Sequence, residues 1–332
     1  MAPRSQKKPA ARVIASAVKQ RSGGRAAPGC EALSIHCVGG TLRAEVGGRQ
    51  SPELQATKSQ RRLWSRAREL LQKEGLVVLR GLLPAALVCT ARTRLLRELS
   101  AAKALRPGTA LDSAMVAPGC LDGEVPMPSL LRRLDLQALP EVLAVLEHEN
   151  LFEATANILQ VDEVVTTAYK WLRAVPPTTF TGPHMDRAYV GEGRRLTAWI
   201  PLGPVRCGQR ELGSLCWIPG SHTNPAVIER FKDYRRVGSD GERSGWLAAD
   251  AGALALPEGC VWRSCHFASG DVAIFGMNLL HTTVPNGTQS FRLSCDTRWQ
   301  PLEDPPPEGV VVGPWRCQPE RPDKEKRMAP LL

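Results

Sequence analysis

A histidine and a carboxylate stand two positions apart in the segment TGPHMDRAY, as His184 and Asp186. Imidazole nitrogen and carboxylate oxygen are both donors that proteins offer to transition metals. If the segment is a strand, residues i and i+2 point to the same face, so this pair could grip one metal ion. The alternative is an exposed loop with a chance polar pair, and the rest of the chain has to decide between the two.

The metal hypothesis needs a third ligand, because two histidines and one carboxylate that leave three positions open form the facial triad of non-haem Fe(II) sites. The downstream candidates are His222, His266 and His281. His222 follows a Pro-Gly turn, and His266 lies in the predicted loop SCHFASGD. His281 ends the predicted strand GDVAIFGMNLLH, and a strand end is well placed to face the mouth of a cavity. This position favours His281, with His222 and His266 still open as candidates, and His222 could instead fix a turn or the rim of a pocket.

A potential anion clamp follows the third histidine. Arg292 comes eleven residues after His281, and Ser294 comes two residues later. On a strand these two side chains share a face. A guanidinium can grip a carboxylate in bidentate fashion, and a hydroxyl can add a further hydrogen bond. The alternative is an arginine on the solvent side of a surface strand.

The elements that must position these residues change character along the chain. Residues 59–73 and 84–102 have apolar side chains at helical spacing, and residues 76–83 read as a buried strand between them. Residues 130–159 are again helical, with an interruption at Pro140. From about residue 163, short apolar runs alternate with Gly and Pro turns, which predicts a β-sandwich, jelly roll or barrel. The layout is thus a helical front and a β-rich back.

Composition excludes several classes of protein. The ten cysteines form no CxxC pair and are scattered, so we expect reduced thiols in an intracellular, cytoplasmic protein. No stretch approaches the roughly 18 apolar residues of a transmembrane helix. The net charge is +10, of which residues 1–60 carry +7 and the remaining 272 residues only +3. A protein that grips nucleic acid with its folded body would carry the excess there, so nucleic-acid binding is disfavoured.

The two ends of the chain differ from its middle. The first thirty residues contain no acidic residue and are rich in Ala, Ser, Arg, Lys and Gly, which is typical of a disordered segment. We predict a basic, disordered tail over 1–57. It could be an organelle transit segment, a nuclear or anionic-surface address, or a plain solvated extension. From Pro301 to the end there are eight prolines, so residues 303–332 are predicted to form a wrapping arm or a loose tail.

The order and spacing of these motifs resemble one known family. The phrases KWLRAVPP, TGPHMDRAY, LTAWIPLG, GSLCWIPGSH, GDVAIFGMNLLH and FRLSCDTRWQP look like those of the phytanoyl-CoA dioxygenases, which are Fe(II)- and 2-oxoglutarate-dependent. The resemblance covers about residues 70–302. It implies a mostly β fold with flanking helices, the double-stranded β-helix (a cupin-like jelly roll). It also implies one dioxygenase domain over 58–302, with a helical front at 58–160 and a catalytic core at 161–302.

The resemblance also implies roles for individual residues. The three that would hold iron are His184, Asp186 and His281. The five at the cosubstrate site would be Arg292, Ser294, Trp199, Thr283 and Lys170. In this scheme Arg292 pairs with the distal carboxylate of 2-oxoglutarate and Ser294 assists it.

The resemblance implies an Fe(II)-dependent enzyme that consumes 2-oxoglutarate and O2 and hydroxylates an aliphatic carbon of a small or lipid-like molecule. One alternative is a non-catalytic jelly-roll module, which would be expected to have a broken triad or to lack the arginine. Another is a nucleic-acid or protein demethylase that docks through the basic tail, which the charge distribution disfavours. The sequence leaves the substrate and the oligomeric state open.

Overall fold

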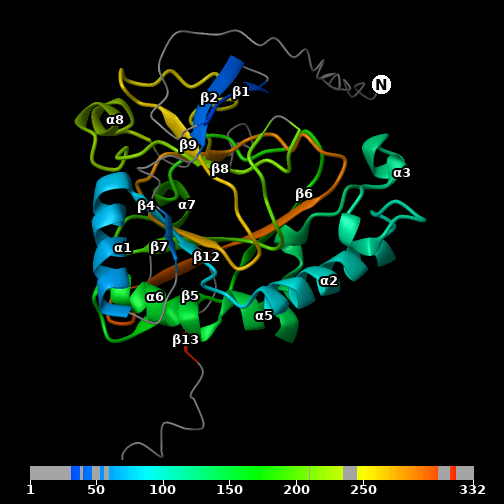
Figure 1. The fold of residues 1–332 in the computed structure, drawn as a ribbon, viewed down its shortest axis with the longest axis horizontal. Coiled ribbons are helices and arrows are strands. Elements are labelled where there is room, and N and C mark those ends of the chain that lie inside the picture. Colours follow the sequence, from blue (N-terminus) through cyan, green and yellow to red (C-terminus); the bar gives the residue numbers. More distant parts are fainter. Residues whose placement is uncertain are drawn as a thin grey trace, which may run out of the picture.

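Two facing β-sheets with helices on one side make up the protein, seen here in a computed structural model. The structure describes residues 31–37, 40–46, 53–55, 60–208, 210–234, 245–305 and 315–318. The helices α1, α6, α5 and α2 follow one another along one side of the sheets in Figure 1. The mostly antiparallel sheets with flanking helices confirm the predicted fold class, the jelly roll.

The larger sheet holds the strand with the predicted anion clamp. Its strand order is β13 (Trp315–Cys317), β5 (Val164–Thr167), β12 (Arg292–Pro301), β7 (Leu196–Pro201), β10 (Val272–Gly276), β4 (Leu76–Arg80) and β3 (Glu53–Gln55). The strand β6 (Trp171–Val175) also pairs with β12. All pairs are antiparallel except β3 with β4.

The smaller sheet holds the strand that begins with the third predicted ligand. Its order is β1 (Glu31–Cys37), β2 (Gly40–Val46), β9 (Trp262–Ser264), β8 (Leu215–Trp217) and β11 (His281–Thr283). The strands β2 and β9 run parallel, and the other pairs are antiparallel.

The helices form the predicted front of the chain. The longer ones are α1 (Gln60–Glu74), α2 (Ala85–Ala101), α5 (Pro140–Leu146) and α6 (Glu149–Leu159). The short ones are α3 (Pro118–Leu121), α4 (Leu134–Gln137), α7 (Arg187–Val190) and α8 (Pro225–Arg230), with 3₁₀ turns η1 (Leu111–Ser113) and η2 (Leu130–Arg132). Pro140 begins α5, since proline lacks the N–H that a helix interior requires but fits its first turn. The predicted interruption of the 130–159 segment therefore lies where the sequence placed it.

Alternation along β12 separates the core from the site. Leu293 and Cys295 belong to the apolar core that the sheet shares with the helices. Their neighbours Arg292 and Ser294 point to the opposite face, because successive side chains of a strand alternate. On that face, Arg292 lies against Trp199 of the adjacent strand β7, with its guanidinium carbon 5.9 Å from the ring centroid. The region between the two sheets therefore receives the polar side chains of β12.

Both end segments of the chain contribute strands to the sheets. The prediction of a disordered tail over 1–57 is wrong for β1, β2 and β3, which pair with each other or with the sheets. Composition was the wrong guide there, because Leu33, Ile35 and Cys37 alternate with polar residues as in a strand. The acid-free first thirty residues, and with them the proposed targeting signal, lie outside the described residues. In the Pro-rich arm, β13 adds to the edge of the larger sheet beside β5.

Within the described ranges, no helix combines the length and the apolar character that crossing a bilayer would require.

Candidate active site

The two histidines of the predicted triad are joined through their backbones. The His184 N–H donates to the His281 carbonyl at 2.9 Å, and the His281 N–H donates back at 3.0 Å. This two-way bridge connects the loop before α7 to the first residue of β11. It holds the two imidazole ring centroids 4.1 Å apart, although the residues are 97 positions apart in the sequence.

Two local predictions about these residues are corrected. His184 makes only an isolated bridge, and Asp186 has helical dihedral angles as the residue before α7, so the pair does not lie on a continuous strand. Likewise, β10 ends at Gly276, and His281 opens the separate strand β11 in the other sheet. The apolar run around residues 277–280 looks strand-like because it is buried, whereas it forms the turn that carries the chain from one sheet to the other.

The three predicted ligands converge on one point. Atoms that could bind a metal on His184, Asp186 and His281 all lie within 4.8 Å of one another, and all three residues are buried. The Oδ1 atom of Asp186 lies 3.5 Å from Nε2 of His184 and 3.8 Å from Nε2 of His281. No other cluster of at least three such residues occurs in the described part of the chain.

Hydrogen bonds fix the orientation of both imidazoles. Nδ1 of His184 lies 2.8 Å from the carbonyl of Gly182, and Nδ1 of His281 lies 2.9 Å from that of Leu279. A carbonyl can only accept, so each Nδ1 carries the proton and each Nε2 keeps its lone pair for a metal. Burial, and then the neighbouring His184, lower the pKa of His281 to about 4. The ring is therefore neutral near pH 7, as metal ligation requires.

The second oxygen of Asp186 has partners that were not foreseen from the sequence. The Thr197 hydroxyl donates to Oδ2, and Nη2 of Arg298 lies 3.2 Å from the same atom. Burial works against ionisation of this carboxyl, but the charge of Arg298 and the contacts with His184 and His281 together outweigh it and keep the pKa of Asp186 well below its usual range. Arg298 was not singled out from the sequence. A signal was available, since Arg298 lies at an even spacing from Arg292 on one strand and so shares its face.

The predicted clamp has free donors. Arg292 is 1% exposed, and its Nη1 donates to the carbonyl of Gly213 at 2.6 Å. Its Nε and Nη2, and the hydroxyl of the adjacent inward-facing Ser294, have no hydrogen-bond partner among the described residues. Burial lowers the pKa of Arg292 to about 10, so the guanidinium is still charged near pH 7. A buried cation with two unsatisfied donors is suited to an anionic ligand.

Two further predicted cosubstrate residues lie near the triad or the clamp. Trp199 contacts Arg292 as described above and packs edge-on against Phe267. Thr283 is on β11, two residues after His281, and therefore shares its face of the strand. The Thr283 hydroxyl accepts a hydrogen bond from the Thr181 N–H at 2.8 Å, so it also fastens the loop that leads to His184.

Lys170 is not brought to the other predicted residues. Its ammonium lies 2.9 Å from Glu147, at the end of α5, and donates to the Thr167 carbonyl at 2.6 Å. Burial lowers the pKa of Lys170, and the charge of Glu147 opposes that shift. The ion pair lies on the helix side of the larger sheet, near Cys295, whereas Arg292 and Ser294 face the other side. Its contacts indicate a role in docking the helices.

The alternative histidines are engaged elsewhere. Nε2 of His222 lies 3.0 Å from the carbonyl of Gln72. Nδ1 of His266 accepts a hydrogen bond from the Cys207 N–H at 3.0 Å. Neither belongs to the buried cluster of potential metal ligands. Their contacts fit the turn and loop roles expected from the sequence.

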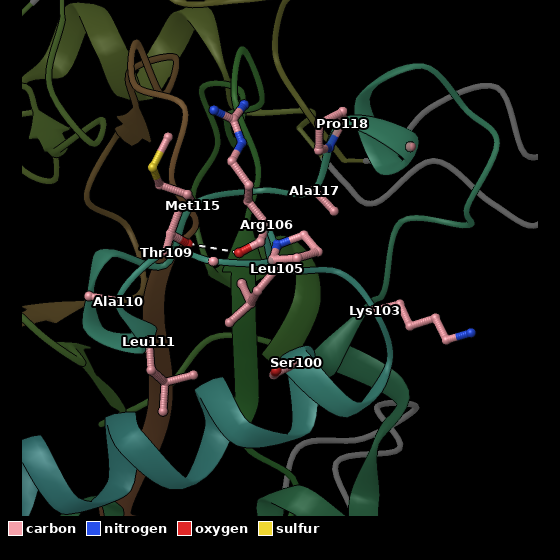
Figure 2. Close-up of a pocket in the computed structure, with 13 residues that line it drawn as sticks. Ser100, Lys103, Leu105, Arg106, Thr109, Ala110, Leu111, Met115, Ala117 and Pro118 are labelled. Carbon is pink, nitrogen blue, oxygen red and sulfur yellow. Dashed lines mark hydrogen bonds between the residues drawn. The ribbon is translucent and has the colours of Figure 1, made fainter.

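A pocket of about 630 Å³ lies apart from the triad, between the end of α2 and the loop that follows it. In Figure 2 Leu105 and Leu111 point toward α2, whereas Arg106 and Met115 project to the other side of the loop. The Thr109 hydroxyl donates to the Arg106 carbonyl at 2.8 Å and closes the loop. None of the predicted ligands or clamp residues lines this pocket. It is therefore separate from the candidate active site.

Residues 71–294 match the family model described as phytanoyl-CoA dioxygenase (PhyH). The chain belongs to the phytanoyl-CoA dioxygenase family. The match includes both histidines of the triad, Asp186 and the Arg292 clamp. Family membership confirms the prediction from the sequence motifs and the predicted oxidoreductase class, for which Fe(II) is the metal cofactor and 2-oxoglutarate and O2 are the cosubstrates. No curated protein sequence matches the chain.

Solved structures to which the chain is similar include two enzymes associated with nogalamycin and one protein from a Streptomyces strain. The carbocyclase SnoK of nogalamycin biosynthesis, described as non-heme and alpha-ketoglutarate-dependent, shares 16% identity at a TM-score of 0.50 and covers 74% of this chain and 87% of its own. The epimerase SnoN, solved with Fe3+, alpha-ketoglutarate and a nogalamycin, shares 19% sequence identity at a TM-score of 0.47. The match covers 78% of this chain and 96% of SnoN. AviO1 from Streptomyces viridochromogenes Tue57 shares 20% sequence identity at a TM-score of 0.47. The match covers 73% of this chain and 97% of AviO1. At 16% identity the likeness to SnoK is one of fold.

The side chains of this structure fit the iron and the dicarboxylic acid that the family implies. Two imidazole Nε2 atoms and one carboxylate oxygen converge, which is the donor set of a facial triad for Fe(II). On the strand β12, Arg292 offers two unsatisfied buried N–H donors and Ser294 offers a hydroxyl. Without a ligand these buried donors would be costly, so their presence is itself evidence of a binding site.

Proposed function

We propose that the chain hydroxylates an aliphatic carbon of a small or lipid-like molecule within the domain spanning residues 58–302. One O2 and one 2-oxoglutarate would be consumed per turnover, one oxygen atom entering the new hydroxyl and the other entering succinate, with release of CO2. The observation that carries the proposal is the buried His184–Asp186–His281 cluster, in which both Nε2 atoms approach one carboxylate oxygen. The substrate class rests on the surroundings of that cluster.

In this proposal His184, Asp186 and His281 hold Fe(II), while Arg292 and Ser294 bind the far carboxylate of 2-oxoglutarate. When bound, iron would activate O2, which is the oxidant for an aliphatic C–H bond, and 2-oxoglutarate would supply the other two electrons. The protein supplies orientation: the Nδ1–H groups lock both imidazoles, and Arg292 holds one end of the dicarboxylate. Burial of all these groups keeps water from the reacting atoms.

Apolar side chains beside the triad support an aliphatic substrate. Met277 and Val190 are buried together, with Trp171 and Tyr189 packed against them. The Tyr189 ring meets the His184 ring edge-on, with 5.5 Å between centroids. A hydrocarbon segment can replace water along such a surface at a gain of about 0.8 kcal/mol per buried CH₂.

Two of the fold neighbours give a reason to consider outcomes of the same chemistry other than hydroxylation. The fold neighbours include a carbocyclase and an epimerase, which shows that this fold carries reactions other than hydroxylation. A non-catalytic role would predict a missing ligand or a missing clamp arginine, and the described residues include all four. Hydroxylation remains our proposal because it needs no group beyond those already assigned.

The test is a screen of metabolite and lipid extracts for substrate-dependent release of succinate. The purified full-length chain is incubated with Fe(II), 2-oxoglutarate and ascorbate, and the product is examined by mass spectrometry. We expect a product heavier by one oxygen atom, labelled when ¹⁸O₂ is used. Arg195→Gln serves as the matched control, because Arg195 is a buried arginine that donates to Gln300, Glu192 and Pro305 and not to the triad. A product lighter by two hydrogens, or of unchanged mass, would overturn hydroxylation.

A further inference from the structure

The two oxygens of the Asp186 carboxylate have different surroundings. Oδ1 faces the Nε2 atoms of both histidines, at 3.5 and 3.8 Å. Oδ2 faces away from them and contacts the Thr197 hydroxyl and Nη2 of Arg298. The two contacts come from neighbouring strands, since Thr197 on β7 pairs directly with Arg298 on β12. The carboxylate is thus held on one oxygen and free on the other.

Besides its contact with Asp186, the Arg298 side chain contacts the ring of Trp171. It is 2% exposed, and its guanidinium carbon lies 4.4 Å from the ring centroid of Trp171, which covers one face. Nε and Nη1 have no hydrogen-bond partner within the described residues. Burying a guanidinium costs several kcal/mol unless it is paired, so the contact that justifies its presence is the one with Asp186.

The arrangement matters because a carboxylate can bind a metal through one oxygen or through both. A facial triad works only if three positions of the metal stay open for the reactants. A carboxylate that bound through both oxygens would occupy one of these positions. Hydrogen bonds to the outer oxygen of a metal-binding carboxylate also fix its orientation and raise metal affinity.

We propose that Arg298 and Thr197 are positioning residues that engage Oδ2 of Asp186 and leave Oδ1 alone to ligate the metal. The inference rests on the proposed function, because it assumes that the triad binds a metal ion. It goes beyond that function by assigning two residues that neither the motif nor the family match singles out. It also predicts that Arg298 and Thr197, which are not ligands themselves, limit the number of protein donor atoms that bind the metal.

The experiment measures binding of Co(II) alone to the full-length chain, by calorimetry and by the visible absorption of the bound ion. The variants are Arg298→Gln, Arg298→Lys and Thr197→Val. Each has a matched control: Arg195→Gln removes a buried guanidinium near the start of β7, and Thr297→Val removes a buried hydroxyl on the opposite face of β12. Thermal unfolding without metal separates loss of fold from loss of metal binding.

We expect Arg298→Gln to raise the Kd for Co(II) about 10- to 100-fold, the range found when the partner of a metal ligand is removed. Thr197→Val should act in the same direction and less strongly, and Arg298→Lys should fall between wild type and Arg298→Gln. The Co(II) spectrum should change in the Arg298 variants and stay the same in both controls, because the absorption of bound Co(II) reports its donor atoms. If Arg298→Gln does not fold, the Thr197→Val result decides.

Two results would contradict different parts of the account. If wild type binds Co(II) and the Arg298 and Thr197 variants bind it with the same Kd and spectrum, the positioning role is wrong while the triad stands. If wild type and His281→Ala do not differ in Co(II) binding, the triad itself is wrong, and the proposed function fails with it. A loss of unfolding temperature with unchanged Co(II) binding would make Arg298 a purely structural residue.

Discussion

Replacing Arg292 separates the cosubstrate clamp from the metal site. The guanidinium uses Nη1 for the Gly213 carbonyl and leaves Nε and Nη2 without partners among the described residues. Arg292→Lys keeps one positive charge but has a single nitrogen, which cannot serve Gly213 and both oxygens of a carboxylate together. Arg292→Gln removes the charge as well. We therefore expect affinity for 2-oxoglutarate to fall from wild type through the lysine variant to the glutamine variant.

The size of the effect follows from the burial of Arg292, which is 1% exposed. Removing one partner of a buried, charge-assisted pair costs about 2–5 kcal/mol. At 1.4 kcal/mol per tenfold, this corresponds to a rise in the Kd for 2-oxoglutarate of roughly 30- to 4,000-fold. Ser294→Ala removes one neutral hydrogen bond of about 0.5–1.5 kcal/mol, or roughly 2- to 10-fold. The structure thus predicts both a ranking and a gap between the two residues.

The assay is anaerobic calorimetry of 2-oxoglutarate binding to the Fe(II)-loaded protein, with Fe(II) affinity measured separately. Fe(II) affinity should be unchanged in all three variants, because neither residue is a proposed metal ligand. Arg195→Gln is the control for loss of a buried guanidinium. The reasoning would be refuted if Arg292→Gln bound 2-oxoglutarate as tightly as wild type. It would also be refuted if Ser294→Ala cost more than Arg292→Gln.

Two further predictions concern the surroundings of the site. Lys170→Met should lower the free energy of unfolding by about 3 kcal/mol, because it leaves the carboxylate of Glu147 buried without its main partner. The affinity for 2-oxoglutarate should not change. A changed affinity would place Lys170 at the cosubstrate site. Gly182→Ala should destabilise the protein by about 1–3 kcal/mol in chemical denaturation, since a Cβ would overlap the Trp246 ring; an unchanged midpoint would show that the ring moves freely.

Spacing along the chain grouped His184 with Asp186 and Arg292 with Ser294, and the family resemblance assigned the roles of metal ligand and clamp, which stay predictions. The two-residue spacing of His184 and Asp186 and the position of His281 led to the triad, although neither segment has the strand geometry that was assumed. The alternation that places Arg292 and Ser294 on one face holds in β12. The prediction for β12 holds because side chains alternate along a real strand, whereas His184 and Asp186 reach His281 through the backbone bridge between His184 and His281 and not through alternation.

Long-range pairing was out of reach of such reasoning. The contact of Arg298 with Asp186 depends on which strand lies beside which, and nothing local in FRLSCDTRW encodes it. Lys170 was placed by analogy, and its ammonium turns to Glu147 because the helix α5 ends there. The strands at 31–55 were hidden by a compositional argument about the residues before them. The first two errors concern contact partners, the third concerns secondary structure, and none concerns the type of fold.

The central claim is that His184, Asp186 and His281 together hold Fe(II) where 2-oxoglutarate can reach it. Its most direct test is the visible metal-to-ligand charge-transfer band that forms when 2-oxoglutarate binds Fe(II) in the absence of oxygen. The account predicts this band for wild type and its loss when any one of the three residues is replaced by alanine. A wild-type protein without the band, or a His281→Ala variant with an unchanged band, would contradict it.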